Sequence, residues 1–230
     1  MPLSIVVFLL SGAALAVFFN LLLPVLVYRF RLRRRAGWAS SNGFQRCEPP
    51  AAPLLEPLTL RIFKTRRGRV LSCASRGPLT LIDYAFTQSL GGGNPTDSAE
   101  VRRATTIVLA ALAADAPSVI VRPRLQGIPR FLLDNVAQAR GRSGAIVRAL
   151  RSSIETGDAA FDGAFQTIGD DERSVRACLG PGVRRAMMTS PRSSYEIGGR
   201  HAAVWAPGLA FGEELDRMIE AAEALMRELR

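Results

Sequence analysis

The chain has 230 residues, of which 48% are hydrophobic, and its mean hydropathy is +0.13. Such a chain is too apolar to be disordered throughout and too poor in glycine and proline to be fibrous. Its three cysteines (Cys47, Cys73 and Cys178) cannot all pair and show no C-x-x-C spacing, so we expect neither a disulfide framework nor a cysteine-rich zinc site. The single histidine, His201, excludes any mechanism that needs two imidazoles.

The formal charge of +10 is concentrated in the first part of the chain. Residues 1–103 hold 14 basic and 5 acidic residues, whereas residues 104–230 hold 16 and 15. Arginine accounts for every basic residue except Lys64, at isolated positions as well as in clusters, and we attribute this bias to a GC-rich bacterial genome. The excess positive charge therefore belongs to the N-terminal part and not to the whole surface.

No charged residue occurs between Leu3 and Tyr28, a run of 26 residues. As a helix this run would be roughly 39 Å long, against about 30 Å for the hydrocarbon core of a bilayer. We expect a transmembrane anchor over residues 1–28. A cleaved secretory signal fits less well, because no Lys or Arg precedes the run and because the run exceeds the usual apolar region of a signal. The lipid bilayer is thus the first predicted partner, through residues 3–28.

Five arginines follow the apolar run within seven residues: Arg29, Arg31, Arg33, Arg34 and Arg35. Because positive charge stays on the cytoplasmic side, this run predicts an N-terminus outside and the rest of the chain in the cytoplasm, at the bacterial plasma membrane. Unpaired cysteines fit a reducing cytosol. The same arginines are also candidates for contact with anionic lipid.

The rest of the chain predicts a linker and an α+β domain. Residues 29–58 read as an Arg-rich juxtamembrane segment and a Pro-rich linker, and residues 59–230 as a cytosolic domain. Alternating and β-branched residues predict short strands, and their short links favour an antiparallel sheet with helices on one face. The expected strands are 60–64, 70–74, 80–88, 103–112 and 118–122, with Pro117 separating the last two.

The second half of the domain is predicted to be mainly helical. We expect helices at 130–139, 145–152, 171–179 and 183–188, an extended segment at 161–168, and a hairpin that turns at Gly198 and Gly199. Residues 213–230 form an amphipathic helix, which we expect to pack on its own sheet. A partner-binding or coiled-coil helix is the alternative. The apolar stripe of this helix consists of Leu215, Met218, Ile219, Ala222, Leu225, Met226 and Leu229.

Motifs for catalysis, cofactors or metals do not stand out. The glycines at 91–93 match neither a P-loop nor a dinucleotide fingerprint and predict a hairpin loop. Asp170, Asp171 and Glu172 lack the ligand spacing of a calcium loop and fit the start of a helix better. No nucleophile elbow accompanies His201. We therefore name no catalytic, cofactor-binding or metal-binding residue, and a non-enzymatic role is favoured.

A second basic stretch is the best candidate for binding. It consists of Arg61, Lys64, Arg66, Arg67 and Arg69. A charged turn is its simplest interpretation, and contact with anionic lipid is the alternative, because the stretch lies close in sequence to the first arginine run. Nucleic acid is not favoured, since Phe63 is the only aromatic residue available for stacking there.

The residue order resembles that of an uncharacterised family of bacterial membrane-anchored proteins, of the domain-of-unknown-function type. The features that carry the resemblance are an N-terminal span, a β-rich middle, a Phe-x-x-x-Phe element, an Asp-containing turn and a short Arg/Leu helix, followed by an apolar strand and a terminal helix. In this chain the middle features read Phe161, Phe165, Asp170, Arg176, Leu179, Pro181 and Met188. The resemblance implies an architecture and a location, and no activity.

Taken together, the patterns favour a membrane-anchored, cytosol-facing interaction or scaffold protein, with a membrane protein as a candidate partner. An anionic-lipid-binding module that uses residues 29–35 and 61–69 is the first alternative, and an enzyme acting on a membrane substrate is the second.

Overall fold

The computed structural model describes residues 23–48, 68–90, 99–124 and 153–230. The contacts divide the chain into two units, Met1–Gln45 and Arg46–Arg230, which are described separately below. Several predicted elements lie outside the described residues: the strand at 60–64, the glycine loop at 91–93, and the helices at 130–139 and 145–152. Most of the apolar run does as well.

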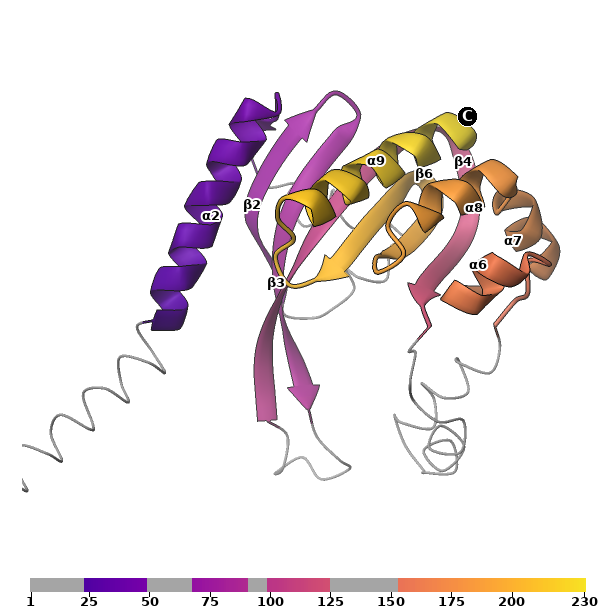
Figure 1. Ribbon diagram of the computed structural model, residues 1–230, viewed down its shortest axis with the longest axis horizontal. Coiled ribbons are helices and arrows are strands. Elements are labelled where there is room, and N and C mark those ends of the chain that lie inside the picture. The colour runs from indigo at the N-terminus through magenta and orange to yellow at the C-terminus, as the bar shows by residue number, and fades with distance from the viewer. Residues whose placement is uncertain (1–22, 49–67, 91–98, 125–152) are drawn as a thin grey trace, which may run out of the picture. The chain divides into compact units, whose positions relative to one another are not determined.

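The first unit contains one described helix, α2 (Leu23–Ser41), which continues from the end of the apolar run through all five arginines (Figure 1). Its C-terminus closes in a Schellman motif: Phe44 N–H donates to Ala39 O at 2.8 Å, Gly43 N–H donates to Ser40 O at 3.2 Å, and Gly43 has a φ of 76°. Residues 36–41, which were expected in the linker, are therefore helical. None of the helices in the described ranges combines the length and the apolar character needed to cross a bilayer.

The second unit is built on a six-stranded sheet in which β1-β2-β3-β4-β5 are successive neighbours and β6 pairs with β4. The four strand pairings β2–β3, β3–β4, β4–β5 and β4–β6 are antiparallel, as expected. The strand bounds are β1 (Gln45–Arg46), β2 (Arg69–Arg76), β3 (Leu79–Leu90), β4 (Ala99–Pro123), β5 (Phe165–Gly169) and β6 (Ser194–Pro207).

Strand β4 organises this sheet. Ile107 pairs with Ile82 of β3 and Trp205 of β6, whereas Val119 pairs with β5 and β6. Because a strand has only two edges, β3 and β5 lie one after the other along one edge of β4, and β6 lies along the other. Beyond the ends of β2 and β6, the pairing of β3 with β4 continues as far as Leu90 and Ala99, which gives the two-stranded ribbon in Figure 1.

Two predicted strand ends, at Pro117 and at Gly198–Gly199, are wrong for the same physical reason. Pro117 does not end a strand, because it lies where the β4–β6 register shifts between Ala116 and Val119, and a proline at such an irregularity loses no ladder hydrogen bond. Likewise, the expected hairpin at Gly198–Gly199 is a single strand, β6. Gly199 has a φ of 54° and lies opposite the shifted part of β4.

Four helices complete the described part of the second unit: α6 (Ala159–Ala164), α7 (Glu172–Cys178), α8 (Pro181–Met188) and α9 (Glu213–Glu228). The predicted helices at 171–179, 183–188 and 213–230 are confirmed. The extended segment at 161–168 is only half correct. The Asp158 side chain accepts a hydrogen bond from Phe161 N–H and starts α6, so the chain is extended only from Phe165 onward.

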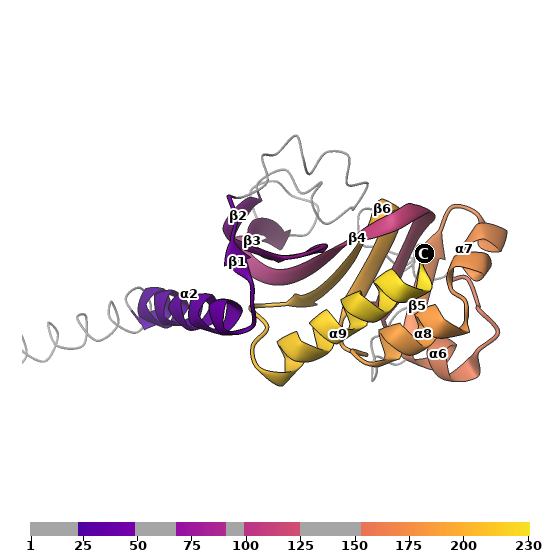
Figure 2. The same ribbon diagram turned by 90° about the horizontal axis from the view of Figure 1, so that it is seen from above.

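Both faces of the sheet are apolar. Leu81, Val108 and Val204 are directly paired across β3, β4 and β6 and share one face. Ile82, Ile107 and Trp205 share the other, where a cluster of Ile82, Tyr84, Ile107 and Ala203 is buried. Figure 2 shows α6, α8 and α9 on the same side of the sheet, and α9 packs on β4 and β6. The domain is thus α+β, as expected.

Candidate functional site

The first arginine run lies on α2, in the first unit. Arg33 and Arg34 are exposed, whereas Arg35 is buried with 3% of its surface accessible. Arg29 and Arg31 belong to the same helix. Phe30, which lies between them, is 65% exposed, an unusual position for a large apolar side chain in water. The run is therefore not a uniform cationic surface, since at least one of its five members is part of a packed structure.

Most of the second basic stretch lies outside the residues that the structure describes. Arg61, Lys64, Arg66 and Arg67 lie outside the described residues, and Arg69 is exposed at the first position of β2. Its lipid contact therefore stays a prediction.

The apolar stripe of α9 contributes to the core of its own domain. Leu215, Met218, Ile219, Ala222 and Leu225 are buried beneath the helix, and α9 contacts α8 as well as the sheet. Met226 and Leu229 are only partly buried. A partner that bound the whole stripe would have to displace the sheet. Burial of each large aliphatic side chain stabilises the fold by about 2 kcal/mol, which such a partner would have to replace.

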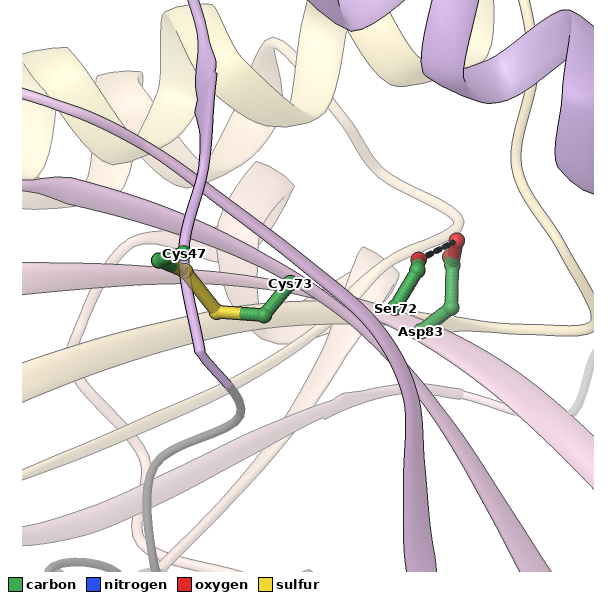
Figure 3. The surroundings of a disulfide bond; sticks show 4 residues. All are labelled: Cys47, Ser72, Cys73 and Asp83. Atoms are coloured by element: carbon green, nitrogen blue, oxygen red, sulfur yellow. Dashed lines mark hydrogen bonds between the residues drawn. A yellow bond between two sulfur atoms is a disulfide. The ribbon is translucent and has the colours of Figure 1, made fainter.

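A disulfide links Cys47 to Cys73 of β2 (Figure 3). The two Cα atoms are 5.4 Å apart, and Cys47 N–H donates a hydrogen bond to Cys73 O at 3.1 Å. The expectation of unpaired cysteines is therefore wrong for this pair. The bond holds the segment that follows β1 against the sheet. Cys178 is free, and its burial raises the pKa of its thiol to about 11, which makes it a poor nucleophile near neutral pH.

A fully buried carboxylate lies one strand away from the disulfide. Asp83 of β3 accepts a hydrogen bond from Ser72 Oγ at 2.7 Å on one oxygen and from Thr106 Oγ1 at 2.9 Å on the other. Thr106 Oγ1 also accepts a hydrogen bond from Ala210 N–H at 3.0 Å. The network joins β2, β3 and β4 to the segment before α9. Because every one of these groups is engaged within the fold, we interpret the network as structural.

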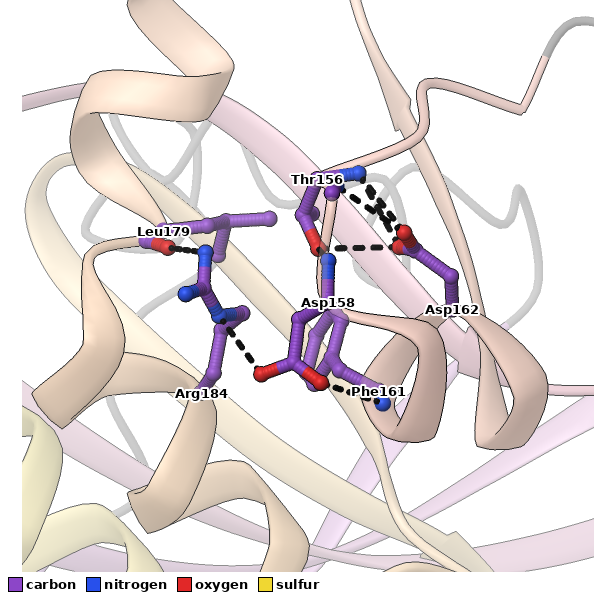
Figure 4. A network of polar contacts seen from close by, with 7 residues as sticks. Thr156, Asp158, Phe161, Asp162, Leu179 and Arg184 are labelled. Atoms are coloured by element: carbon purple, nitrogen blue, oxygen red, sulfur yellow. Dashed lines mark hydrogen bonds and ion pairs between the residues drawn. The ribbon is translucent and has the colours of Figure 1, made fainter.

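A second polar network connects α6 to α8 (Figure 4). The carboxylate of Asp162 accepts hydrogen bonds from Thr156 N–H, Thr156 Oγ1 and Gly157 N–H at 2.9–3.1 Å. Asp158 caps α6 and forms an ion pair with Arg184 Nε at 3.2 Å, and Arg184 Nη1 donates to Leu179 O at 3.0 Å. The Asp162 carboxylate is thus occupied by the backbone and a hydroxyl, and that of Asp158 by the backbone and a cation, so we interpret both as structural.

Asp171 and His201 are two further titratable groups that are affected by their surroundings. Asp171 caps α7 by accepting from Ser174 N–H at 2.8 Å. Hydrogen bonding to the Ser174 side chain, together with this backbone contact, lowers the pKa of the Asp171 carboxyl. The expectation that Asp170–Glu172 marks a helix start is confirmed. Burial, assisted by the charge of Arg200, lowers the pKa of His201. Within the described ranges, no three His, Cys, Asp or Glu side chains group as metal ligands would.

The sequence offered only weak signals for the features that it did not predict. Asp83 stands between Ile82 and Tyr84 in a predicted strand, and a carboxylate among large apolar residues is a usable sign of a buried network. For the disulfide there was no such sign, because β1 has only two residues and no periodicity that would place Cys47 beside Cys73.

The architecture is that of an α+β domain whose long central strand pairs with two strands on one edge and one on the other. No protein-family model matches the chain. No curated protein matches it either. Among solved structures, the crystal structure of the mycobacterial trehalose monomycolate transport factor A matches 88% of this chain and 96% of its own, with 15% sequence identity and a TM-score of 0.50. At this identity the match shows a shared fold and nothing finer.

Proposed function

We propose that this chain is a membrane-anchored, cytosol-facing docking protein of the bacterial plasma membrane, whose α+β domain holds a membrane partner without catalysing a reaction. The anchor is the apolar run of residues 3–28. Anchoring raises the local concentration of the domain near membrane proteins, so that a weak docking contact becomes effective. The structural neighbour is named as a transport factor, which is compatible with a docking role.

The observation that carries the proposal is the continuity of α2. One helix joins the end of the apolar run to the arginines, with Phe30 exposed beside the first of them and Arg33 and Arg34 exposed one turn later. Aromatic and cationic residues in this order are typical of a helix that leaves the hydrocarbon core through the headgroups. A helix that only served a water-exposed linker would gain nothing from an exposed Phe30.

Two features argue for opposite sides of the membrane. The arginine run favours the cytoplasm, whereas the Cys47–Cys73 disulfide is typical of oxidising compartments. We assign the cytoplasmic side because charge next to the first apolar segment acts during insertion, before the domain can fold and form the bond. The cysteine pair of a cytosolic domain would then be reduced in the cell and close on oxidation.

Crosslinking in intact cells followed by detergent purification of the full chain tests the docking role. We expect one or more membrane proteins to be enriched over a control that joins residues 1–45 to an unrelated soluble domain. Partners that appear equally with the control would assign binding to the anchor and not to the domain. A full chain that purifies alone from every crosslinked sample would contradict the proposal.

The lipid-binding alternative is favoured by the exposure of Arg33 and Arg34 on α2. Its measurement is the anionic-lipid content that co-purifies with the full chain in detergent. We expect the double variant Arg33→Gln/Arg34→Gln to retain less anionic lipid, since each such cation contributes about 1 kcal/mol. The matched control is Arg173→Gln/Arg176→Gln on α7, which removes the same charge from exposed positions of the domain.

A further inference from the structure

A groove with a volume of about 500 Å³ lies beside the C-terminal half of α9, near the chain end marked in Figure 1. One wall is formed by the turn between β2 and β3 together with part of β4, and the other by α9. Volumes of about 300–1,000 Å³ are typical of small-molecule sites. The groove is lined by Pro78, Ala111, Leu112, Ala113, Glu223, Met226, Arg227 and Arg230.

The floor of the groove is apolar and is held by the backbone. Ala111 N–H donates to Pro78 O at 3.0 Å, which fixes the turn against β4. Ala111 and Ala113 are exposed but have only methyl groups, so they leave the space above β4 open. Leu112 and Met226 complete the lining from the sheet and from α9. A short apolar group would remove this surface from water.

The rim of the groove is cationic. Arg227 and Arg230 have no acidic partner in the described part of the chain. Glu223, the acidic residue of the lining, forms an ion pair with Arg76 at 2.6 Å, so its charge is neutralised. Arg200 adds a further cation at the edge, where its Nη2 donates to Ala113 O at 3.0 Å. Unpaired guanidinium groups above an apolar floor favour a ligand with a carboxylate or phosphate at one end.

Arg227 lies in the last turn of α9 and Arg230 two residues beyond its end. Cations there complement the helix dipole, and this is the simplest structural role for both. That role predicts an effect on helix stability alone. It requires neither an open apolar floor nor the neutralisation of Glu223 by a residue from β2. A groove that combines unpaired arginines, an open apolar floor and a neutralised Glu223 is distinguished from an ordinary helix end.

We propose that the groove binds a small amphiphilic anion, in which a carboxylate or phosphate is joined to a short apolar chain. The anionic end lies between Arg227 and Arg230, and the chain lies over Ala111 and Leu112 toward Met226. This site is separate from the arginine run on α2 and goes beyond the docking function.

Hexyl phosphate is a suitable probe because it is soluble and combines both chemical features. We titrate it calorimetrically into the full chain in nanodiscs of zwitterionic lipid, beside inorganic phosphate and hexanol. Hexyl phosphate should bind more tightly than either of the two fragments. Arg227→Gln/Arg230→Gln should weaken it at least about tenfold, since hydrogen bonds to a charged group are stronger than those between neutral groups. Ala111→Trp, which fills the groove from an exposed strand position, should weaken it as well.

Two control variants separate this site from other roles of arginine. Arg217→Gln lies on the same helix, where Arg217 pairs with Glu213, and should bind hexyl phosphate as the original chain does. Arg33→Gln/Arg34→Gln should also bind it unchanged, even where anionic-lipid retention falls, so failure of the membrane proposal is distinguishable from failure of this one. Circular dichroism confirms that each variant keeps its fold.

A second arm identifies the source of the anion. The same nanodiscs are prepared with anionic lipid in place of part of the zwitterionic lipid. Competition with hexyl phosphate would assign the groove to a bilayer lipid, and unchanged binding would assign it to a free amphiphile; both outcomes support the site. The proposal is overturned if hexyl phosphate binds no better than inorganic phosphate, or if the Arg227→Gln/Arg230→Gln variant binds it as well as the original chain.

Discussion

The Thr106 side chain makes two buried hydrogen bonds that link different parts of the fold. Its hydroxyl donates to the buried Asp83 carboxylate and accepts from Ala210 N–H, the backbone group that leads toward α9. Losing the hydroxyl therefore affects a buried charge and a buried amide at once. A buried group without a partner costs more than the hydrogen bond itself contributed.

The change Thr106→Val keeps the shape of the side chain and removes the hydroxyl. We expect the free energy of unfolding to fall by about 2–3 kcal/mol, as measured by urea denaturation. The matched control is Thr105→Val, at the neighbouring buried position, where the hydroxyl donates only to Ala206 O. Its cost should be about 1 kcal/mol. Equal losses in the two variants would show that the Asp83 network has no special weight.

The disulfide makes a prediction that depends on counting thiols. The oxidised protein should show one reactive thiol after unfolding, that of Cys178, and three after reduction. Because the bond joins positions 26 residues apart, Cys47→Ser/Cys73→Ser should lower the free energy of unfolding by about 3 kcal/mol. Cys178→Ser is the control, and its oxidised form should show no free thiol after unfolding. Three reactive thiols that persist after treatment of the folded protein with a disulfide-forming oxidant would contradict the bond.

At the scale of elements, the ends of the helices were predicted better than the ends of the strands. Asp171 before α7 is a local signal, because a cap acts within one turn. The start of α8 was predicted two residues late, since Pro181 is already its first residue. Asp158 before α6 is a signal of the same kind, but the prediction rested only on the extended pattern of 161–168 and did not use it. In contrast, Pro117 and Gly199 were misjudged because their tolerance in β4 and β6 depends on a register shift between two strands, which local sequence does not contain.

The cap of α7 gives a pH prediction. Hydrogen bonds from Ser174 lower the folded-state pKa of Asp171 below its usual 3.8, so its stabilising contribution is present above that value and is lost as the pH falls through the lower folded-state pKa. Asp171→Asn keeps a capping oxygen without the charge. We expect this variant to be less stable than the original chain near pH 6 and equally stable near pH 2, as followed by urea denaturation. The control is Asp170→Asn, one residue earlier, which removes the same charge outside the cap.

At the scale of the whole molecule, the fold class could be predicted from the sequence and the binding surfaces could not. Periodicity and turn residues predicted the antiparallel sheet and α9, because these patterns report which side of an element is buried. The groove requires β2, β4 and α9 to meet, with Arg76 from one end of the sheet neutralising Glu223 near the end of the chain. Which elements lie side by side is a property of the topology, and it leaves no pattern in the sequence of any one of these three elements.

Orientation in the membrane and the redox state of the cysteine pair are linked, since both depend on which compartment holds the domain. The arginine run, if it sets orientation, should control both together. Arg35 has to be kept in any test, because it is buried and its loss would disturb the packing of α2. The other four arginines of the run can be changed together.

The variant carries Arg29→Gln, Arg31→Gln, Arg33→Gln and Arg34→Gln. In the original chain we expect a C-terminal fluorescent reporter to be active and a C-terminal alkaline phosphatase to be silent. Thiol trapping in intact cells should find Cys47 and Cys73 reduced. The variant should shift a measurable fraction of molecules to the opposite reporter pattern, and the same fraction should carry the disulfide.

A control with four exposed arginines of the domain changed (Arg173, Arg176, Arg185 and Arg217) should keep the original pattern, because these positions lie far along the chain from the first apolar segment. Phosphatase activity together with an oxidised pair in the original chain would place the domain outside, and the disulfide would then be a permanent part of its fold.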